Sequence, residues 1–155
     1  MRPEVEACIG LGANLGDAAQ ALRDALAALD AHPGMRVLKS SGFYRTAPVD
    51  AGGPDFINAV ALVATTLSAP DLLTALQAIE HGAGRLRPYR NAPRTLDLDL
   101  LTYGTARIDS PALTVPHPRM MDRAFVLVPL DEVLPARVPP AALDAVRHQP
   151  VERLD

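Results

Sequence analysis

Two carboxylates set two residues apart mark the segment Pro93–Leu101, which reads Pro-Arg-Thr-Leu-Asp-Leu-Asp-Leu-Leu. Because successive side chains of a strand alternate between its faces, Asp97 and Asp99 are predicted to share one face while the leucines beside them point into a core. The same alternation is also typical of an ordinary half-exposed antiparallel strand. Two fixed carboxylates beside arginines suit a magnesium ion together with a phosphate group.

The segment before this strand strengthens the phosphate interpretation. Residues 82–94 contain four arginines and no acidic residue, so the loop is expected to need an anion to balance its charge. Guanidinium groups form forked, charge-assisted hydrogen bonds to phosphate oxygens. A polyphosphate held by a metal would satisfy the arginines and the carboxylates together.

Composition limits the class of protein that can use these residues. The chain has 155 residues, a formal net charge of −3 and a single cysteine, Cys8. One domain over residues 1–155 is therefore expected, and a general nucleic-acid binder is disfavoured because it would carry excess basic charge. Cys8 lies in an apolar run and is predicted to be a core residue. No segment has the length of a membrane span or of a signal peptide core, so we expect a cytoplasmic protein with no membrane partner.

Hydrophobic periodicity divides the chain into strands and helices. Strands are predicted over 5–11, 37–44, 56–66 and up to Tyr103, and the last is expected to form a hairpin with 106–109. Helices are predicted from Asp17 to just before His32, from Ser68 to Gly82, and near 141–147. This order favours an α+β fold, a ferredoxin-like α/β sandwich with a mainly antiparallel sheet and helices on both faces.

Two further groups of residues are candidates for a site, and a third is not. Phe56 and Asn58 share a predicted strand face, where a flat ring could stack on one while the amide of the other contacts its edge; core packing is the alternative for Phe56. His117, between two prolines, is either a solvated loop residue or a phosphate donor. The glycines of Gly10–Gly16 lack the spacing and the acidic residue of a dinucleotide fingerprint, so they are interpreted as a tight turn beside the sheet edge.

Several motifs together resemble one known family. They are Gly10–Gly16, Phe43–Pro48, Asp55–Ala59, Gly84–Arg87, Pro93–Asp99, Val115–His117 and Arg123–Phe125. In this order and spacing the chain resembles 6-hydroxymethyl-7,8-dihydropterin pyrophosphokinase, an enzyme of folate biosynthesis. The resemblance covers nearly the whole chain, and the Pro-Arg-Thr-Leu-Asp-Leu-Asp motif is its most specific part.

The resemblance implies a reaction and a set of roles. The hydroxyl of 6-hydroxymethyl-7,8-dihydropterin attacks the β-phosphorus of ATP, so that pyrophosphate is transferred and AMP leaves, with two Mg²⁺ ions required. By similarity, Asp97 and Asp99 bind both ions, and Arg85 and Arg94 close on the phosphates during catalysis. The implied pterin pocket consists of Thr46, Pro48, Val49, Phe56, Asn58 and Phe125. The implied ATP contacts are Gln77, Glu80, Arg87, Leu100, Thr114, His117 and Arg123.

The chain departs from the family pattern mainly where the adenosine would bind. Asn91 stands where many members have a tryptophan, Ala112 replaces an arginine, and Pro118 replaces a tyrosine of some members. Phe56 replaces a tyrosine, which keeps a stacking surface but removes a hydroxyl. These changes leave the carboxylate pair and the aromatic pair intact, so we expect activity with altered nucleotide affinity.

Two alternatives use the same residues. A metal-dependent phosphodiesterase or nucleotidyl hydrolase could employ the carboxylate pair, although such enzymes usually need further acids or histidines to activate water. A non-catalytic nucleotide- or pterin-binding module is also compatible with the fold, since fold alone does not determine function. For the enzyme we expect small-molecule substrates, no nucleic-acid partner and a monomer.

Overall fold

The computed structural model describes residues 3–14, 16–47, 54–84 and 96–154. The strands are β1 (Val5–Ala13), β2 (Met35–Ser40), β3 (Phe43–Thr46), β4 (Phe56–Thr65), β5 (Asp97–Tyr103), β6 (Ile108–Asp109), β7 (Thr114–Val115) and β8 (Glu152–Leu154). The helices are α1 (Ala18–Ala31), α2 (Ala69–Gly84), α3 (Ala124–Val133) and α4 (Pro140–Val146), with short 3₁₀ turns at Met120–Asp122 and Pro135–Arg137.

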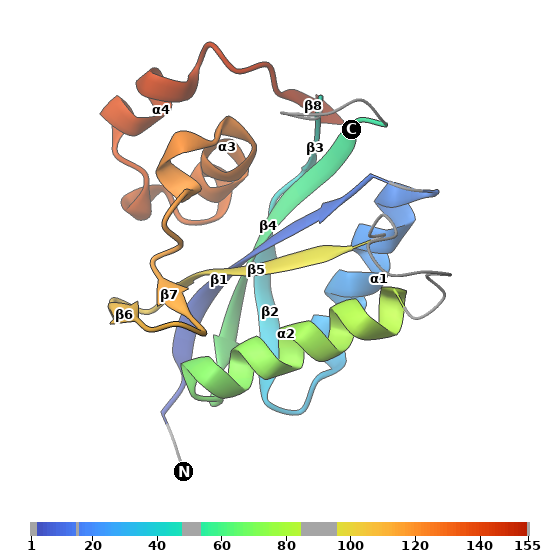
Figure 1. Ribbon diagram of the computed structural model, residues 1–155, viewed down its shortest axis with the longest axis vertical. Coiled ribbons are helices and arrows are strands. Elements are labelled where there is room, and N and C mark those ends of the chain that lie inside the picture. The colour runs from blue at the N-terminus through green and yellow to red at the C-terminus, as the bar shows by residue number, and fades with distance from the viewer. Residues whose placement is uncertain (1–2, 15, 48–53, 85–95, 155) are drawn as a thin grey trace.

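The main sheet has six strands in the order β5-β1-β4-β3-β8, with β2 also paired to β4 (Figure 1). Every pairing in the described part of the chain is antiparallel. The order of β5, β1, β4 and then β2 or β3 is that of a ferredoxin-like sandwich, as predicted. Because β1 and β4 are the central strands, their side chains are covered on both faces.

Helices cover both faces of the sheet, as expected, with α1 and α2 on one side and α3 and α4 on the other (Figure 1). The alternation of β4 separates the two cores: Ile57 and Ala59 pack on the α1/α2 side, whereas Val60 and Leu62 pack on the α3 side. Cys8 is fully buried in the α3 core, and burial raises the pKa of its thiol above the ordinary value. No helix in the described ranges is long and apolar enough to cross a membrane.

Helix α1 begins as its sequence predicts. Asp17 is the N-cap, and its Oδ1 accepts a hydrogen bond from the backbone N–H of Gln20 at 3.0 Å. The helix ends just before His32, whose ring Nδ1 accepts a bond from the N–H of Gly34. These local bonds set the ends of the helix that supports β1 from the α1/α2 side.

The predicted single strand over 37–44 is wrong, because residues Ser41 and Gly42 interrupt it and separate β2 from β3. At the break, the N–H of Ser41 donates to the carbonyl of Val60, and the Ser41 hydroxyl accepts from the N–H of Val60 at 3.0 Å. A side chain therefore replaces part of the backbone ladder. This allows β3 to leave the path of β2 and pair with β8 on its other edge.

The predicted hairpin between β5 and residues 106–109 is also wrong. Residues Ile108–Asp109 form β6, which pairs with β7 in a separate two-stranded sheet. The backbone N–H of His117 instead donates to the carbonyl of Leu101 on β5. A Gly104 turn with φ of +55° directs the chain away from β5, and that conformation favours glycine.

Gly10 and Gly12 do not form the predicted tight turn beside the sheet edge. Strand β1 extends to Ala13, so Gly10 and Gly12 belong to a central strand flanked by β4 and β5 and form neither a turn nor a sheet edge. Of the two turn glycines with positive φ in the described ranges, only Gly16, with φ of +59°, lies in this motif. The physical reason is register: β1 needs these residues to pair along the full length of β4.

Helix α3 is held to the sheet by a polar cluster around Glu132. Its carboxylate accepts hydrogen bonds from the Tyr44 hydroxyl at 2.6 Å, from the N–H of Gly42 at 3.1 Å and from the Arg153 guanidinium at 3.2 Å. Burial by itself would raise the pKa of Glu132, but these bonds outweigh it and hold the pKa below the ordinary value. The cluster joins α3 to both β3 and β8.

We expect Glu132→Gln to lower the free energy of unfolding at pH 7 by about 1 kcal/mol, because one charged hydrogen-bond acceptor in a partly exposed cluster is lost. Since the folded pKa lies below the unfolded one, the contribution is fully present above the unfolded pKa and is lost as pH falls through the folded pKa. Denaturant unfolding at pH 7 and about pH 3 checks this. The difference in the free energy of unfolding between Glu132→Gln and the unmodified protein should be smaller at the lower pH. An equal difference at both pH values would contradict the prediction. Asp131→Asn, one residue earlier on α3, is the control.

Candidate active site

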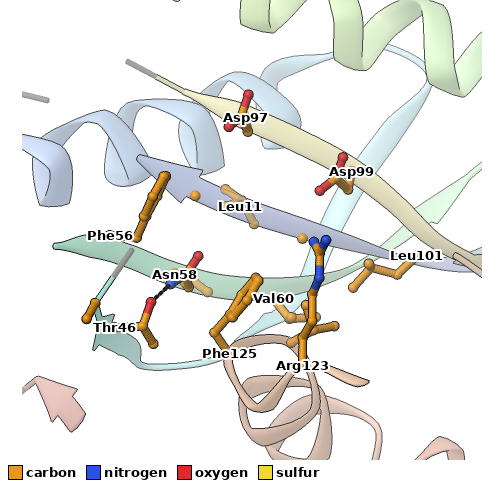
Figure 2. Close-up of a pocket in the computed structure, with 15 residues that line it drawn as sticks. Leu11, Thr46, Phe56, Asn58, Val60, Asp97, Asp99, Leu101, Arg123 and Phe125 are labelled. Carbon is orange, nitrogen blue, oxygen red and sulfur yellow. Dashed lines mark hydrogen bonds between the residues drawn. The ribbon is translucent and has the colours of Figure 1, made fainter. Parts of the chain in front are cut away.

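A cavity of about 190 Å³ opens on the α3 side of the sheet. Its wall contains Gly10, Leu11 and Gly12 from β1, Thr46 and Ala47 at the end of β3, Phe56, Asn58, Ala59 and Val60 from β4, Asp97, Asp99 and Leu101 from β5, and Arg123, Phe125 and Val126 at the start of α3. The cavity therefore lies where the neighbouring strands β5, β1 and β4 meet the first turn of α3 (Figure 2).

Two glycines form the floor of this cavity. In the register of the sheet, Gly12 lies between Asn58 of β4 and Asp97 of β5, and Gly10 lies between Val60 and Asp99. A Cβ atom at Gly12 would lie 3.0 Å from Asn58 Oδ1, closer than ordinary van der Waals contact. Because Gly10 and Gly12 have no side chains, a ligand can approach the backbone of β1 between the Asn58 amide and the two carboxylates.

The two carboxylates lie on β5 as the sequence predicts. Leu98, between them, is 4% exposed and packs on the α1/α2 side, while Asp97 and Asp99 both line the cavity on the opposite side (Figure 2). Asp97 is half-buried and Asp99 is exposed. Leu96 and Leu100 pack with Leu98, so buried leucines anchor the strand beneath the acidic pair.

Aromatic rings and an amide form the opposite part of the wall. Phe56 on β4 and Phe125 on α3 are both half-buried, and Figure 2 shows Asn58 lying between them. Asn58 is 6% exposed, and its Nδ2 donates to Thr46 Oγ1 at 2.9 Å. This bond turns the amide oxygen of Asn58 away from Thr46, toward the glycine floor.

Arg123 adds positive charge at the same end of α3. Its guanidinium carbon lies 5.4 Å from the centre of the Phe125 ring, within the range of a cation–π contact. In Figure 2 its guanidinium extends toward the strand that carries Asp99. A second cavity of about 470 Å³ shares Thr46, Ala47, Arg123 and Phe125 with the first and continues toward His148–Val151.

Other residues predicted for a nucleotide lie outside the wall of the first cavity. Gln77 is exposed on α2, and Thr114 is half-buried on β7. Leu100 is 3% exposed, with its side chain in the α1/α2 core, so only its backbone is available to a ligand. Glu80, also on α2, accepts a hydrogen bond from the N–H of Leu98 at 2.7 Å, which ties this helix to the strand between the two aspartates.

His117 lies beside the outer edge of β5. Its backbone N–H donates to Leu101, and its ring Nδ1 accepts a hydrogen bond from the N–H of Arg119 at 3.2 Å. An imidazole ring that accepts a hydrogen bond at Nδ1 carries its proton on Nε2, so this second nitrogen is a donor. Five further predicted residues, Pro48, Val49, Arg85, Arg87 and Arg94, fall outside the described ranges.

The sequence interpretation missed several parts of the cavity wall. The sequence predicts a turn at Gly10 and Gly12, and Val60, Leu101 and Val126 are not among the predicted site residues. The glycine spacing did hold a usable signal, because two glycines two residues apart in a strand leave one face without side chains. The apolar members carried no signal that would distinguish them from ordinary core residues.

The acidic pair matches the requirements of magnesium better than those of a closed metal site. No group of three or more His, Cys, Asp or Glu side chains able to hold a metal occurs in the described ranges. Magnesium usually binds through one or two carboxylates and completes its shell with water and substrate phosphates. Asp97 and Asp99, sharing one face at the mouth of a cavity, therefore fit a metal that arrives with a phosphorylated ligand.

Comparison with known proteins identifies the family. The model of 7,8-dihydro-6-hydroxymethylpterin-pyrophosphokinase (HPPK) matches residues 8–135. The chain is 42% identical over 153 residues to 2-amino-4-hydroxy-6-hydroxymethyldihydropteridine pyrophosphokinase of Pseudomonas aeruginosa, covering 94% of each chain. It is 41% identical over 149 residues to the protein of the same name from Synechocystis, covering 96% of this chain and 76% of the relative.

A solved structure agrees with the fold. A crystal structure of Plasmodium falciparum HPPK-DHPS matches with a TM-score of 0.69 at 14% identity, covering 96% of this chain and 43% of the other, so this chain spans less than half of that protein. Such a likeness shows the fold alone, whereas the family match and the sequence relatives span most of the chain. The chain therefore belongs to the 7,8-dihydro-6-hydroxymethylpterin-pyrophosphokinase family of ATP-dependent diphosphotransferases.

Proposed function

We propose that the cavity on the α3 side is where this chain performs the reaction of its family, the transfer of pyrophosphate from ATP to 6-hydroxymethyl-7,8-dihydropterin in folate biosynthesis. One observation carries the proposal. Asn58, Gly12 and Asp97 occupy one row across three neighbouring strands, which sets an amide and a carboxylate on either side of an open floor. A flat heterocycle can lie over the glycine with its reactive arm directed toward the acidic pair.

The pterin is proposed to lie between Phe56 and Phe125. Offset stacking on aromatic rings suits a flat bicyclic ligand and adds to the apolar area it buries. Because Asn58 donates to Thr46, its amide oxygen is available to accept a hydrogen bond from an N–H on the polar edge of the pterin. Backbone groups near Thr46, with Pro48 and Val49, are proposed to complete the pocket.

Asp97 and Asp99 are proposed to hold two Mg²⁺ ions together with the phosphates of ATP. When bound, these ions would supply neutralisation of phosphate charge and alignment of the reacting oxygens. The two carboxylates themselves are held by a strand whose intervening Leu98 is buried and whose backbone is tied to Glu80. Their separation is therefore set before any ligand binds.

The remaining charged and polar groups are proposed to bind and orient ATP. Arg123 brings a guanidinium to the cavity wall, and Nε2 of His117 offers a donor at the edge of β5. Arg85 and Arg94 are proposed to stabilise the phosphates in the transition state. The other proposed ATP contacts are Gln77, Glu80, Arg87, Thr114 and the backbone of Leu100.

Catalysis is proposed to depend on charge and positioning without a dedicated protein base. In the described part of the cavity wall, the titratable side chains are Asp97, Asp99 and Arg123. Both carboxylates are assigned to metal binding, and an arginine stays protonated at all ordinary pH values. Alignment of the pterin hydroxyl with the β-phosphorus is then the main contribution of the protein.

The proposal extends to the state of the protein. Residues 1–155 are proposed to act as one domain and as a monomer, because both cores share a single sheet and Met121 is the one large hydrophobic side chain found exposed in the described ranges. A cytoplasmic location is proposed because the reaction uses ATP. The partners are proposed to be small molecules and not nucleic acid, consistent with the net charge of −3.

Analysis of the nucleotide product tests the function directly. Protein, Mg²⁺, ATP and 6-hydroxymethyl-7,8-dihydropterin should yield AMP and the pterin diphosphate in equal amounts, measured by anion-exchange chromatography. Reactions without pterin are the control. ADP or free phosphate as the main product, or hydrolysis of ATP that does not need pterin, would contradict the proposal and favour a metal-dependent hydrolase.

Removing either carboxylate tests the metal assignment. Asp97→Asn and Asp99→Asn should each lower kcat by about 10²-fold or more, because a charge that stabilises the transition state is lost. Circular dichroism and thermal unfolding should show an intact fold, since neither side chain belongs to a core. Asp144→Asn on α4, where the carboxylate is 75% exposed, is the matched control and should keep normal activity. Normal turnover in both site variants would exclude the assignment.

A methyl group on the cavity floor tests the position of the pterin. Gly12→Ala should raise the KM for the pterin about tenfold while changing the KM for ATP much less, because the added carbon presses on the Asn58 amide oxygen. Steady-state kinetics with each substrate varied in turn measures both values. Gly82→Ala is the control, since a Cβ at that position on α2 would have no atom within 4 Å. An equal change in both KM values would place the pterin elsewhere.

A further inference from the structure

The side chain of Gln149 bonds to the backbone on both sides of Arg123. Its Oε1 accepts a hydrogen bond from the N–H of Ala124 at 2.9 Å, and its Nε2 donates to the carbonyl of Asp122 at 2.9 Å. The half-buried amide of Gln149 therefore uses both its acceptor and its donor on the backbone of residues 122–124. A side chain placed in this way restrains the backbone of Arg123 without touching its guanidinium.

Helix α3 needs such a bond because its own start lacks a cap. Arg123 is the N-cap residue, with an extended backbone at φ −126° and ψ 114°, and it forms no side-chain capping bond. The first N–H groups of a helix have no partner within the helix, and Ala124 supplies the first of them. Gln149, 25 residues away along the chain, provides the acceptor that an N-cap residue usually provides.

The restrained turn carries two residues of the cavity wall. Arg123 and Phe125 both line the first cavity, and their side chains contact each other at 5.4 Å from guanidinium carbon to ring centre. A change in the backbone at Arg123 would rotate the start of α3 and move both side chains together. The width of the gap between Phe125 and Phe56 thus depends on where this turn is held.

Gln149 is itself held by the segment that follows α4. Its N–H donates to the carbonyl of Val146 at 2.9 Å, and three residues later β8 pairs with β3, the strand that ends in Thr46. The segment therefore connects the start of α3 with the opposite wall of the cavity. It lies beyond residue 135, where the match to the family model ends.

We propose that Gln149 is a positioning residue for pyrophosphoryl transfer, which holds the Arg123 turn so that Arg123 and Phe125 meet ATP and pterin in the productive geometry. The inference rests on the proposed function of the cavity. It assigns a role in the active site to the chain after residue 135. Gln149 is not a catalytic residue, because it acts through the backbone of its neighbours.

Gln149→Met tests the proposal, since methionine keeps the length of the side chain but loses both hydrogen bonds. We expect kcat to fall about tenfold or more, because small displacements of positioning groups carry large kinetic costs. The Kd of 6-hydroxymethyl-7,8-dihydropterin should also rise about tenfold. It is measured by calorimetry with Mg²⁺ and α,β-methylene-ATP, an analogue that blocks transfer, so binding is read without turnover.

Two further variants separate positioning from general stability. Arg153 lies in the same segment as Gln149 but away from Arg123, and Arg153→Gln weakens its bond to Glu132. This variant should lower the melting temperature, while kcat and the pterin Kd change less than threefold. Gln149→Glu keeps the acceptor for Ala124 but sets a carboxylate oxygen against the carbonyl of Asp122, and it should also lower kcat and raise the pterin Kd. If Gln149→Met does not fold, kcat and the pterin Kd of Gln149→Glu still test the proposal.

The outcomes are distinct. An unmodified enzyme without pyrophosphokinase turnover would refute the proposed function itself. An active enzyme whose Gln149 variants keep normal kcat and pterin Kd would overturn only the role of Gln149. Losses of activity that follow the fall in melting temperature equally in Gln149→Met and Arg153→Gln would also overturn it, because they would show a purely structural role.

Discussion

The register of β1 between β4 and β5 is the constraint on which the rest of the site depends. It aligns Asn58, Gly12 and Asp97 in one row and Val60, Gly10 and Asp99 in the next. Because both positions on β1 are glycine, the face of the sheet is open between the amide and the carboxylates. A shift of one residue would turn the acidic pair toward the α1/α2 core and bring buried leucines to the cavity.

The site also requires that the start of α3, which forms one wall of the cavity, has a fixed position. Hydrophobic packing of Leu127 and Leu130 buries the helix against the sheet, but packing alone does not determine how the first turn is placed. The Gln149 amide does so, because it bonds to the backbone on both sides of Arg123. Glu132 separately joins the helix to Tyr44 of β3 and to Arg153 of β8. Phe125 is thus held opposite Phe56 by residues distant in sequence.

Some of this arrangement could be predicted because it follows from short-range rules. Alternation along 96–100 gave the correct faces for the leucines and aspartates, and alternation along β4 gave the correct faces for Phe56 and Asn58. Other predictions failed where partners far along the chain decide the structure. The strand expected over 37–44 breaks because Ser41 bonds to Val60, and the hairpin expected after β5 is replaced because β6 pairs with β7.

By itself, the sequence determined which residues carry chemistry, how they alternate on each strand and which family the chain resembles, because strand periodicity and motif spacing are local properties. Only the tertiary structure decided that Gly10 and Gly12 form the floor of a cavity and that Gln149 holds the wall beside it. The physical reason is that both facts depend on contacts between strands and segments far apart in the chain. The spacing of the two glycines indicates a strand face without side chains, but only the pairing register decides what lies beside it. A side-chain-to-backbone bond such as that of Gln149 leaves no periodic pattern in the sequence.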